Sequence, residues 1–218
     1  STLIGGSGYE RITGLVFEEQ SQNVFFAGYT NSSGIADISD PTPIMFPVTK
    51  NAYDTVYNGG IYDGFIGKLD PFSGNALRYA SFIGGNGDDY VMGLGVDVCA
   101  APYVTGSTNS LDYPITEDAS DSTIKKIEGF ITKFNALGNV LVFSSFIGND
   151  DEDQLNGIIV DQSGAIFLGG SVQGSGIPGT NASTNGRDGF IAKIQVGILP
   201  LKPSIDKIGN LSFCKGDS

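Results

Sequence analysis

The sequence has no histidine and no tryptophan, and only two cysteines, Cys99 and Cys214. Histidine is the commonest general base and the commonest metal ligand, so its absence removes the simplest routes to catalysis. The cysteines are far apart and lack a C-x-x-C partner, which excludes a zinc ribbon or a thioredoxin-type site. Because no run of about 20 apolar residues occurs, no membrane-spanning helix is expected.

Charged residues are also scarce, at 17 % of the chain, and acidic ones dominate. The 24 Asp and Glu residues against 12 Lys and Arg give a formal net charge of −12. Phosphate backbones and anionic lipid surfaces would repel such a chain, so neither nucleic acid nor direct membrane insertion is expected. Ser1 begins neither a signal peptide nor a Met start, which indicates a processed or shortened N-terminus.

Glycine, by contrast, is abundant at 32 of 218 residues, about twice its usual ~7 % share. It separates short apolar runs that are rich in β-branched and aromatic residues, the composition typical of strands. Helical periodicity is absent. The sequence therefore predicts an all-β fold.

An internal repeat is the strongest signal in the chain. A Ser-to-Gly signature occurs at 1–6, 81–85 and 145–148, and a Gly-to-acid signature occurs at 14–18, 95–97 and 157–161. A third signature, acid-Gly-Phe-Ile-x-Lys, occurs at 63–69, 128–134 and 188–194. Its glycines are 65 and then 60 residues apart, a spacing that suits four-stranded units with a long loop.

Each unit contains four apolar runs that we interpret as strands. The expected strands are 12–18, 23–30, 64–69 and 76–83, then 91–98, 103–107, 129–134 and 140–147, then 155–161, 165–170 and 189–195, with 198–201 in place of a full fourth strand. Between second and third strands lie polar stretches at 31–61, 108–128 and 172–187. We expect these loops to be variable, to gather at one end of the fold and to carry its specificity.

The repeat resembles the seven-bladed β-propeller family with SBBP repeats. The match is close at Y-V-T-G-S-T (103–108) and D-G-F-I-G-K-L (63–69), and it departs from the family at V-C-A-A-P (98–102). The resemblance implies β-propeller blades of four antiparallel strands. Three blades cannot close a ring, since propellers need about four to eight. The chain would then be the C-terminal part of a larger propeller.

This interpretation divides the chain into four parts. Residues 1–80 would be blade one, with the outer strand of a preceding blade at 1–6, followed by blade two at 81–144 and blade three at 145–199. The tail, 200–218, resembles the start of an Ig-like or PKD-like repeat, in which a cysteine such as Cys214 pairs with a later one.

The acidic turn N-D-D-E-D (149–153) is the candidate metal site. Asp150, Asp151 and Asp153 could supply oxygen ligands to calcium. The turn lacks the spacing of an EF-hand loop, and similar turns follow the glycines of the other units, so a structural turn is the alternative. No other cofactor and no catalytic residue is predicted.

Tyrosines in or beside the long loops are the candidate ligand contacts. Tyr53, Tyr57 and Tyr113 stand among Ser, Thr and Asn residues, with Tyr29 and Tyr62 nearby. Exposed aromatic residues in such settings suit contact with a glycan or a protein. The alternative is that they pack the loops onto the sheets. The Lys68, Lys133 and Lys193 series is expected to pair with acidic turns or to cover apolar surface.

The resemblance implies a non-enzymatic extracellular protein of the cell surface, an adhesin concerned with attachment or gliding motility and exported by type IX secretion, as in large Bacteroidetes surface proteins. Its partners would be a protein or glycan ligand and other domains of the same long chain. One alternative is an assembly scaffold that accepts a partner strand at the open edge of the last blade. Another is a fragment of a propeller glycoside hydrolase or lyase.

Overall fold

The computed structural model describes residues 1–33, 42–148, 151–173 and 186–194, and within these ranges the chain forms β-strands and no helix. No helix in the described part could therefore span a membrane. The strands are β1 (Glu10–Glu18), β2 (Asn23–Thr30), β3 (Asp63–Asp70), β4 (Ala76–Ile83), β5 (Asp89–Val96), β6 (Pro102–Thr108), β7 (Glu128–Phe134), β8 (Leu141–Ile147), β9 (Gln154–Val160), β10 (Ile166–Gln173) and β11 (Arg187–Ile194).

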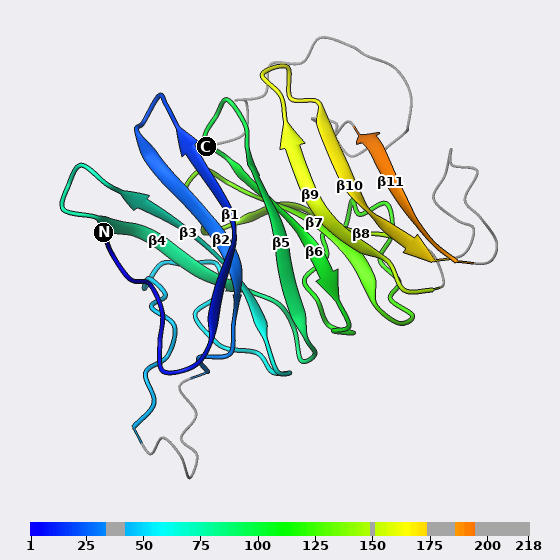
Figure 1. The fold of residues 1–218 in the computed structure, drawn as a ribbon, viewed down its shortest axis with the longest axis horizontal. Helices are drawn as coiled ribbons and strands as arrows, with labels where there is room; N and C mark the ends of the chain where they lie inside the picture. The colour runs from blue at the N-terminus through cyan, green and yellow to red at the C-terminus, as the bar shows by residue number, and fades with distance from the viewer. Residues whose placement is uncertain (34–41, 149–150, 174–185, 195–218) are drawn as a thin grey trace.

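The strands form three antiparallel sheets in which each strand pairs with the next one along the chain (Figure 1). The first sheet contains β1 to β4, the second β5 to β8, and the third β9 to β11. The all-β prediction is confirmed, as is the antiparallel order of four strands in each of the first two units.

Eleven of the expected strands occur, with ends that differ by a few residues. The strands start earlier at Glu10, Asp63 and Asp89, because these acidic residues already belong to the ladders. The expected fourth strand of the third unit, 198–201, lies outside the described residues. Residues 1–6 were expected to form a strand, but they form none. Ile4 instead packs against a cluster of buried residues on the first sheet that includes Phe46, Phe65 and Phe82.

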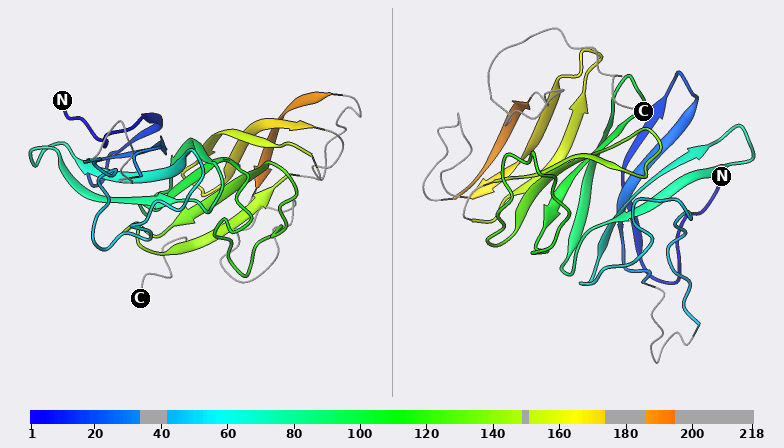
Figure 2. Two further views of the ribbon diagram at one scale, coloured as in Figure 1. Left: turned by 90° about the horizontal axis from the view of Figure 1, so that it is seen from below. Right: turned by 180° about the vertical axis from the view of Figure 1, so that it is seen from behind.

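The three sheets follow one another across the molecule, with their first strands adjacent (Figure 1, Figure 2). β5 contacts β1 and β2, and β9 contacts β5 and β6 in the same way. The backbones approach closely at glycines. A Cβ on Gly14 would lie 2.4 Å from the Cβ of Leu94, and one on Gly93 would lie 3.1 Å from the Cα of Gly157. Glycine at these positions lets neighbouring sheets meet backbone to backbone.

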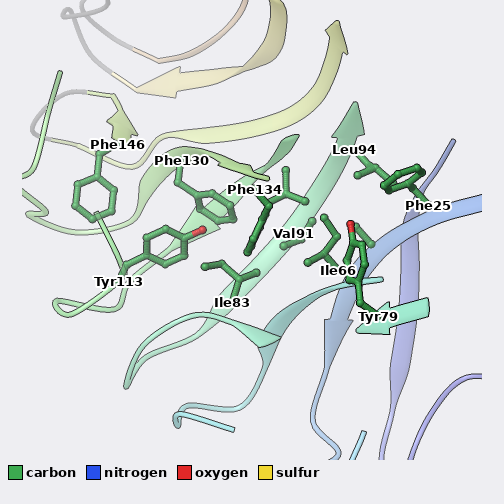
Figure 3. Packing of buried hydrophobic residues seen from close by; sticks show 12 residues of the cluster. Phe25, Ile66, Tyr79, Ile83, Val91, Leu94, Tyr113, Phe130, Phe134 and Phe146 are labelled. Atoms are coloured by element: carbon green, nitrogen blue, oxygen red, sulfur yellow. The ribbon is translucent and has the colours of Figure 1, made fainter. Parts of the chain in front are cut away.

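Two apolar cores fill the spaces between sheets. Between the first and second sheets, Phe25 and Ile66 pack against Val91, Leu94 and Phe130 (Figure 3). Between the second and third sheets the core comprises Tyr103, Ile131, Phe143, Leu155, Ile166 and Leu168. A third cluster covers the opposite face of the first sheet with Phe26, Phe46, Phe65, Ala80 and Phe82.

The repeated lysines pack on aromatic rings of the second strands. The ammonium nitrogens of Lys68, Lys133 and Lys193 lie 4.8, 4.9 and 5.4 Å from the ring centroids of Phe25, Tyr103 and Phe167. Lys133 also forms an ion pair with Asp97 at 3.1 Å. Of the two alternatives expected for these lysines, covering apolar surface is confirmed for all three.

Described segments of the loops after β2 and β6 repeat one another, so the expectation that these loops are variable is wrong for those segments. Phe46 stacks on Phe65 with ring centroids 4.4 Å apart, and Tyr113 lies 4.5 Å from Phe130 in the second sheet. The motifs F-P-V-T (46–49) and Y-P-I-T (113–116) begin these matching segments. Both threonines donate their backbone N–H to the outer strand of their sheet, Thr49 to Ala80 at 2.9 Å and Thr116 to Ser144 at 3.1 Å.

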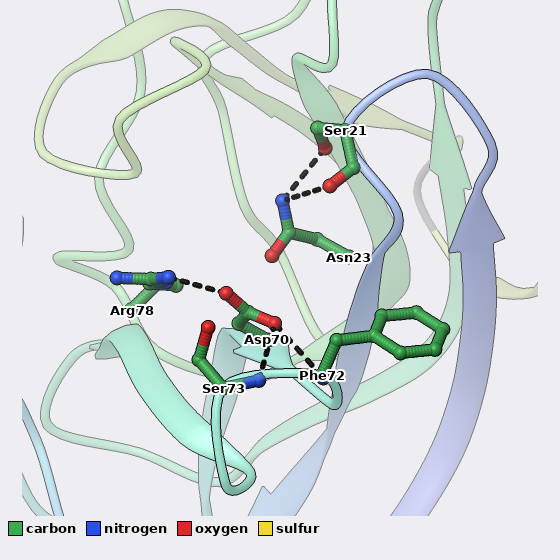
Figure 4. A network of polar contacts seen from close by, with 6 residues as sticks. All are labelled: Ser21, Asn23, Asp70, Phe72, Ser73 and Arg78. Atoms are coloured by element: carbon green, nitrogen blue, oxygen red, sulfur yellow. Dashed lines mark hydrogen bonds and ion pairs between the residues drawn. The ribbon is translucent and has the colours of Figure 1, made fainter.

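The opposite ends of the sheets are closed by short turns held by carboxylates. Asp70 accepts the backbone N–H groups of Phe72 and Ser73 at 2.9 and 3.0 Å, and it bonds to Arg78 (Figure 4). The bond to Arg78 is the main cause of a low pKa of about 2 for Asp70.

The turn at 97–101 is closed in a similar way. Asp97 Oδ1 accepts the N–H groups of Cys99 and Ala101, both at 2.9 Å. The corresponding turn of the third sheet is closed by an aspartate as well, since Asp161 Oδ1 accepts the N–H of Ala165 at 2.8 Å. Cys99 is disulfide-bonded, and Cys214 lies outside the described residues.

Replacing Phe46 with Ala should destabilise the protein strongly. Phe46 is buried although it belongs to a loop, and removing a buried phenyl ring costs about 3–5 kcal/mol. We expect a large fall in the urea midpoint measured by circular dichroism. Phe72→Ala is the control, because this ring is 72 % exposed. Equal midpoints for the two variants would show that the loop does not stabilise the sheet.

Candidate functional site

Four tyrosines from two sheets form an aromatic cluster, here called the tyrosine cluster. Tyr9 directly precedes β1, Tyr62 directly precedes β3, Tyr29 lies near the end of β2, and Tyr90 is the second residue of β5. The ring centroid of Tyr29 lies 5.0 Å from that of Tyr90 and 5.2 Å from that of Tyr62. Tyr9 joins the group at 6.2 Å from Tyr62. The edge-to-face geometry of these pairs is the favourable one for aromatic rings.

The antiparallel order explains why these residues meet. The start of β1, the end of β2 and the start of β3 lie at one end of the first sheet, where Tyr29 pairs with Arg11 on one side and Gly64 on the other. The second sheet then places β5 against the first. Its backbone is tied there by the N–H of Asp89, which donates to the carbonyl of Tyr62 at 2.8 Å. Tyr90, the next residue, therefore reaches the cluster.

The cluster is open to solvent on part of its surface. Tyr9 is 51 % exposed, and the other three tyrosines are partly buried. Arg11 is exposed and donates to the Tyr29 hydroxyl at 3.4 Å, a bond that raises the pKa of Arg11. Burial and the charge of Asp88 raise the pKa of Tyr90. The cluster thus combines aromatic rings, hydroxyl groups, one cation and one nearby anion.

Two buried acids lie next to these tyrosines in the chain. Asp63 follows Tyr62 and Asp89 precedes Tyr90, and both carboxylates are fully buried because neighbouring strand residues point to opposite faces. Asp89 Oδ2 accepts bonds from the N–H of Gly85 and the hydroxyl of Ser110, both at 2.8 Å. The Oδ1 atoms of Asp63 and Asp89 have no hydrogen-bond partner among the described residues.

Burial keeps these carboxyl groups from ionising easily. It raises the pKa of Asp63 to about 8, with the charges of Asp89 and Asp54 adding to the effect. It also raises the pKa of Asp89 to about 6, with a further contribution from the charge of Asp112. The junction between the sheets therefore holds a proton near neutral pH.

The junction between the second and third sheets repeats this arrangement with Glu128 and Asp153. A Cβ on Gly148 would lie 2.3 Å from Glu128 Oε2 and 2.5 Å from Asp153 Oδ2, so both carboxylates converge on this glycine. Burial and the charge of Asp153 raise the pKa of Glu128 to about 7. Acids with raised pKa values can mark catalytic sites. The four buried acids, Asp63, Asp89, Glu128 and Asp153, are at most 1 % exposed. A substrate could therefore not reach them in this conformation.

Asp151 and Asp153, the two predicted calcium ligands that the structure describes, have different partners. Asp151 forms an ion pair with Lys126 at 2.9 Å, whereas Asp153 is buried and accepts the N–H of Gln173 at 3.1 Å. Asp150 lies outside the described residues. No group of three His, Cys, Asp or Glu side chains suited to a metal occurs in the ranges that the structure describes.

The three predicted ligand tyrosines pack their loops onto the sheets. Tyr113 is buried, and its hydroxyl lies 3.0 Å from Thr132 Oγ1. Tyr53 packs edge to face on Phe134 at 5.8 Å, and Tyr57 packs on Phe82 at 5.9 Å. This is the packing alternative left open by the sequence, and it leaves little of Tyr113 for a ligand.

Tyr9 and Tyr90 were missed as candidates because they stand outside the long loops. The sequence does contain a pattern that could have identified them. Tyr9, Tyr62 and Tyr90 are each adjacent to an acidic residue that recurs at the same position of the repeat. Comparison with known proteins adds no further residue. The chain matches no protein-family model and no curated protein.

Asp63→Asn should flatten the dependence of stability on pH. The pKa of Asp63 is raised from 3.8 to about 8 in the folded protein, so between these values the folded state holds a proton that the unfolded chain has released. The associated stability is complete below about pH 4 and is lost as the pH rises through about 8. We expect the variant to match the wild type near pH 4 and to melt several degrees higher near pH 9.

The control for this prediction is Asp118→Asn, which removes an exposed acid and the same unit of charge. Its melting temperatures between pH 4 and 9 should run parallel to those of the wild type. A parallel profile for Asp63→Asn as well would mean that Asp63 holds no proton in the folded state.

Proposed function

We propose that this chain is a non-enzymatic binding module whose ligand docks on the tyrosine cluster. The observation that carries the proposal is the meeting of four tyrosine rings from two sheets, one ring half exposed, beside Arg11 and Asp88. Partly exposed aromatic rings bordered by polar groups supply large contact area with little loss of conformational freedom.

We further propose that the three sheets are blades of a β-propeller of the SBBP type. Two observations support this proposal: the strand order is the same in each sheet, and the first strands β1, β5 and β9 lie next to one another. In a propeller the first strands line the centre, and the loops at their ends form the binding face. The tyrosine cluster would then lie on that face, near the centre.

The ligand class that suits the cluster is a neutral glycan or an exposed protein segment. Sugar rings stack their C–H faces on aromatic rings and bond to flanking carboxylate and guanidinium groups. The net charge of −12 disfavours polyanionic ligands. The setting of an extracellular adhesin, with gliding motility and type IX secretion, rests on the resemblance of the repeat.

An assembly scaffold is the second candidate, and the edge of the third sheet favours it. In the part of the chain that the structure describes, β11 pairs with β10 alone. A strand edge of this kind offers backbone N–H and C=O groups to an added strand. A partner peptide would extend the third sheet by one strand.

Substituting the tyrosine cluster should abolish ligand binding while leaving the fold intact. The wild-type protein would be screened on an array of immobilised neutral glycans, and the best binder measured by calorimetry. We expect Tyr9→Ala to weaken that binding about tenfold, which corresponds to ~1.4 kcal/mol. The double variant Tyr9→Ala with Tyr62→Ala should lose binding.

The matched control is Phe72→Ala, which removes an exposed aromatic ring at the opposite end of β3. This variant should bind like the wild type. If binding survives in the double variant, the ligand does not use the cluster. If no neutral glycan binds, the glycan class is wrong, and an immobilised surface-protein extract tests the protein class with the same variants.

A further inference from the structure

Each sheet offers the next one the same apolar face, called here the acceptor face. In the first and second sheets its centre is Ile66 and Ile131, which are both completely buried. The equivalent residue of the third sheet is Ile191, which follows the same acid-Gly-Phe motif and is 84 % exposed. Ile159 of β9, on the same sheet, is also largely exposed. The acceptor face of the third sheet is therefore uncovered.

The opposite face of each sheet, the donor face, docks on the sheet before it. Leu94 supplies this contact in the second sheet and Ile158 in the third. The equivalent residue of the first sheet is Leu15, which is 68 % exposed, and Ile12 and Phe17 of the same strand are about half exposed. Their counterparts Val91 and Val96 pack in the core between the first two sheets. The part of this donor face that β1 forms is thus uncovered too, whereas Phe65 and Phe82 of the same face are buried beneath Phe46.

A shared β-bulge confirms that these positions are equivalent. The ladder of β1 with β2 skips a residue between Ile12 and Gly14, and that of β5 with β6 skips one between Val91 and Gly93. The ladder of β9 with β10 is irregular at the corresponding place, where Gly169 and Gly170 face Gly157 and Leu155. The first strands of all three sheets therefore present their side chains in the same register.

The glycines of the acceptor faces show the same pattern. A Cβ on Gly64 would lie 2.7 Å from a methyl group of Val91, and one on Gly129 would lie 3.1 Å from Leu155. The third-sheet equivalent, Gly189, has only the carbonyl of Gly170 nearby, at 3.9 Å. Gly157, the equivalent of Gly14 and Gly93, has nothing within 4 Å among the described residues. At Gly157 and Gly189, the third sheet therefore has open space where a donor face packs on the first two sheets.

We propose that a second copy of this chain docks head to tail, with the donor face of its first sheet on the acceptor face of the third sheet. Leu15 of one copy would lie over Gly157 of the other, as Leu94 lies over Gly14, and Ile12 would lie over Gly189, as Val91 lies over Gly64. A second copy is the occupant because one chain carries both halves of an interface that it already forms twice internally. Such contacts are heterologous and either close a ring or continue as a filament.

Self-association of the full 218-residue chain tests the proposal. Sedimentation velocity from about 1 µM to about 1 mM should show a concentration-dependent shift to larger species. Added salt should strengthen the association, because it screens repulsion between copies that each carry a charge of −12. A chain that stays monomeric at every concentration overturns the proposal. The two exposed faces would then be covered by further repeat units of a longer polypeptide.

Matched substitutions locate the interface. Ile191→Lys and Leu15→Lys should each abolish association, because they place a charge at the centre of one face. The controls are Leu111→Lys and Leu137→Lys, whose side chains are 83 % and 70 % exposed outside the two faces. The controls should associate like the wild type. Association that persists in Ile191→Lys, or is lost equally in the controls, contradicts the assigned faces.

Mixing the two interface variants tests the head-to-tail geometry. Ile191→Lys retains an intact donor face, and Leu15→Lys retains an intact acceptor face, so an equimolar mixture should form a one-to-one dimer. An interface that used the same face on both copies would not recover on mixing. Recovery therefore supports the proposal, and failure to recover overturns its geometry.

Discussion

The close approach of first strands at glycine is the constraint on which the rest of the structure depends. Gly14 meets the Cβ and backbone of Leu94, and Gly93 meets the backbone of Gly157, so these glycines contribute no side chain to separate the strands. This contact brings the apolar faces of neighbouring sheets within packing distance. A side chain at either glycine would push the sheets apart and expose both cores.

The same docking creates the polar features at one end of the sheets. When β5 lies against the first sheet, it buries Asp63 and Asp89 at the junction and brings Tyr90 to Tyr29 and Tyr62. Two unpaired buried carboxylate oxygens are costly, and the raised pKa values show that the folded protein responds by keeping a proton there. The tyrosine cluster and the buried acids are therefore two results of one packing event.

The repeat made the strands and their order predictable, because β-branched runs bounded by glycine have few other ways to satisfy their backbone bonds. It also predicted that the lysine series covers apolar surface. The equivalence of the long loops was harder to predict from the sequence. F-P-V-T and Y-P-I-T are short and lie at different distances from their second strands, so their equivalence became clear only from Phe46 and Tyr113 stacking on matching rings.

The sequence by itself determined the all-β class, the unit length and the positions of the acids and glycines that recur in each unit. Only the tertiary structure decided which tyrosines are exposed to solvent, because the loop residue Tyr113 packs on the second sheet and is buried, whereas Tyr9 is exposed at a sheet junction. It also decided that Asp153 faces Glu128 while Asp151 faces Lys126. Strand content depends on local patterns, but such neighbours depend on how the sheets dock, which no local pattern encodes.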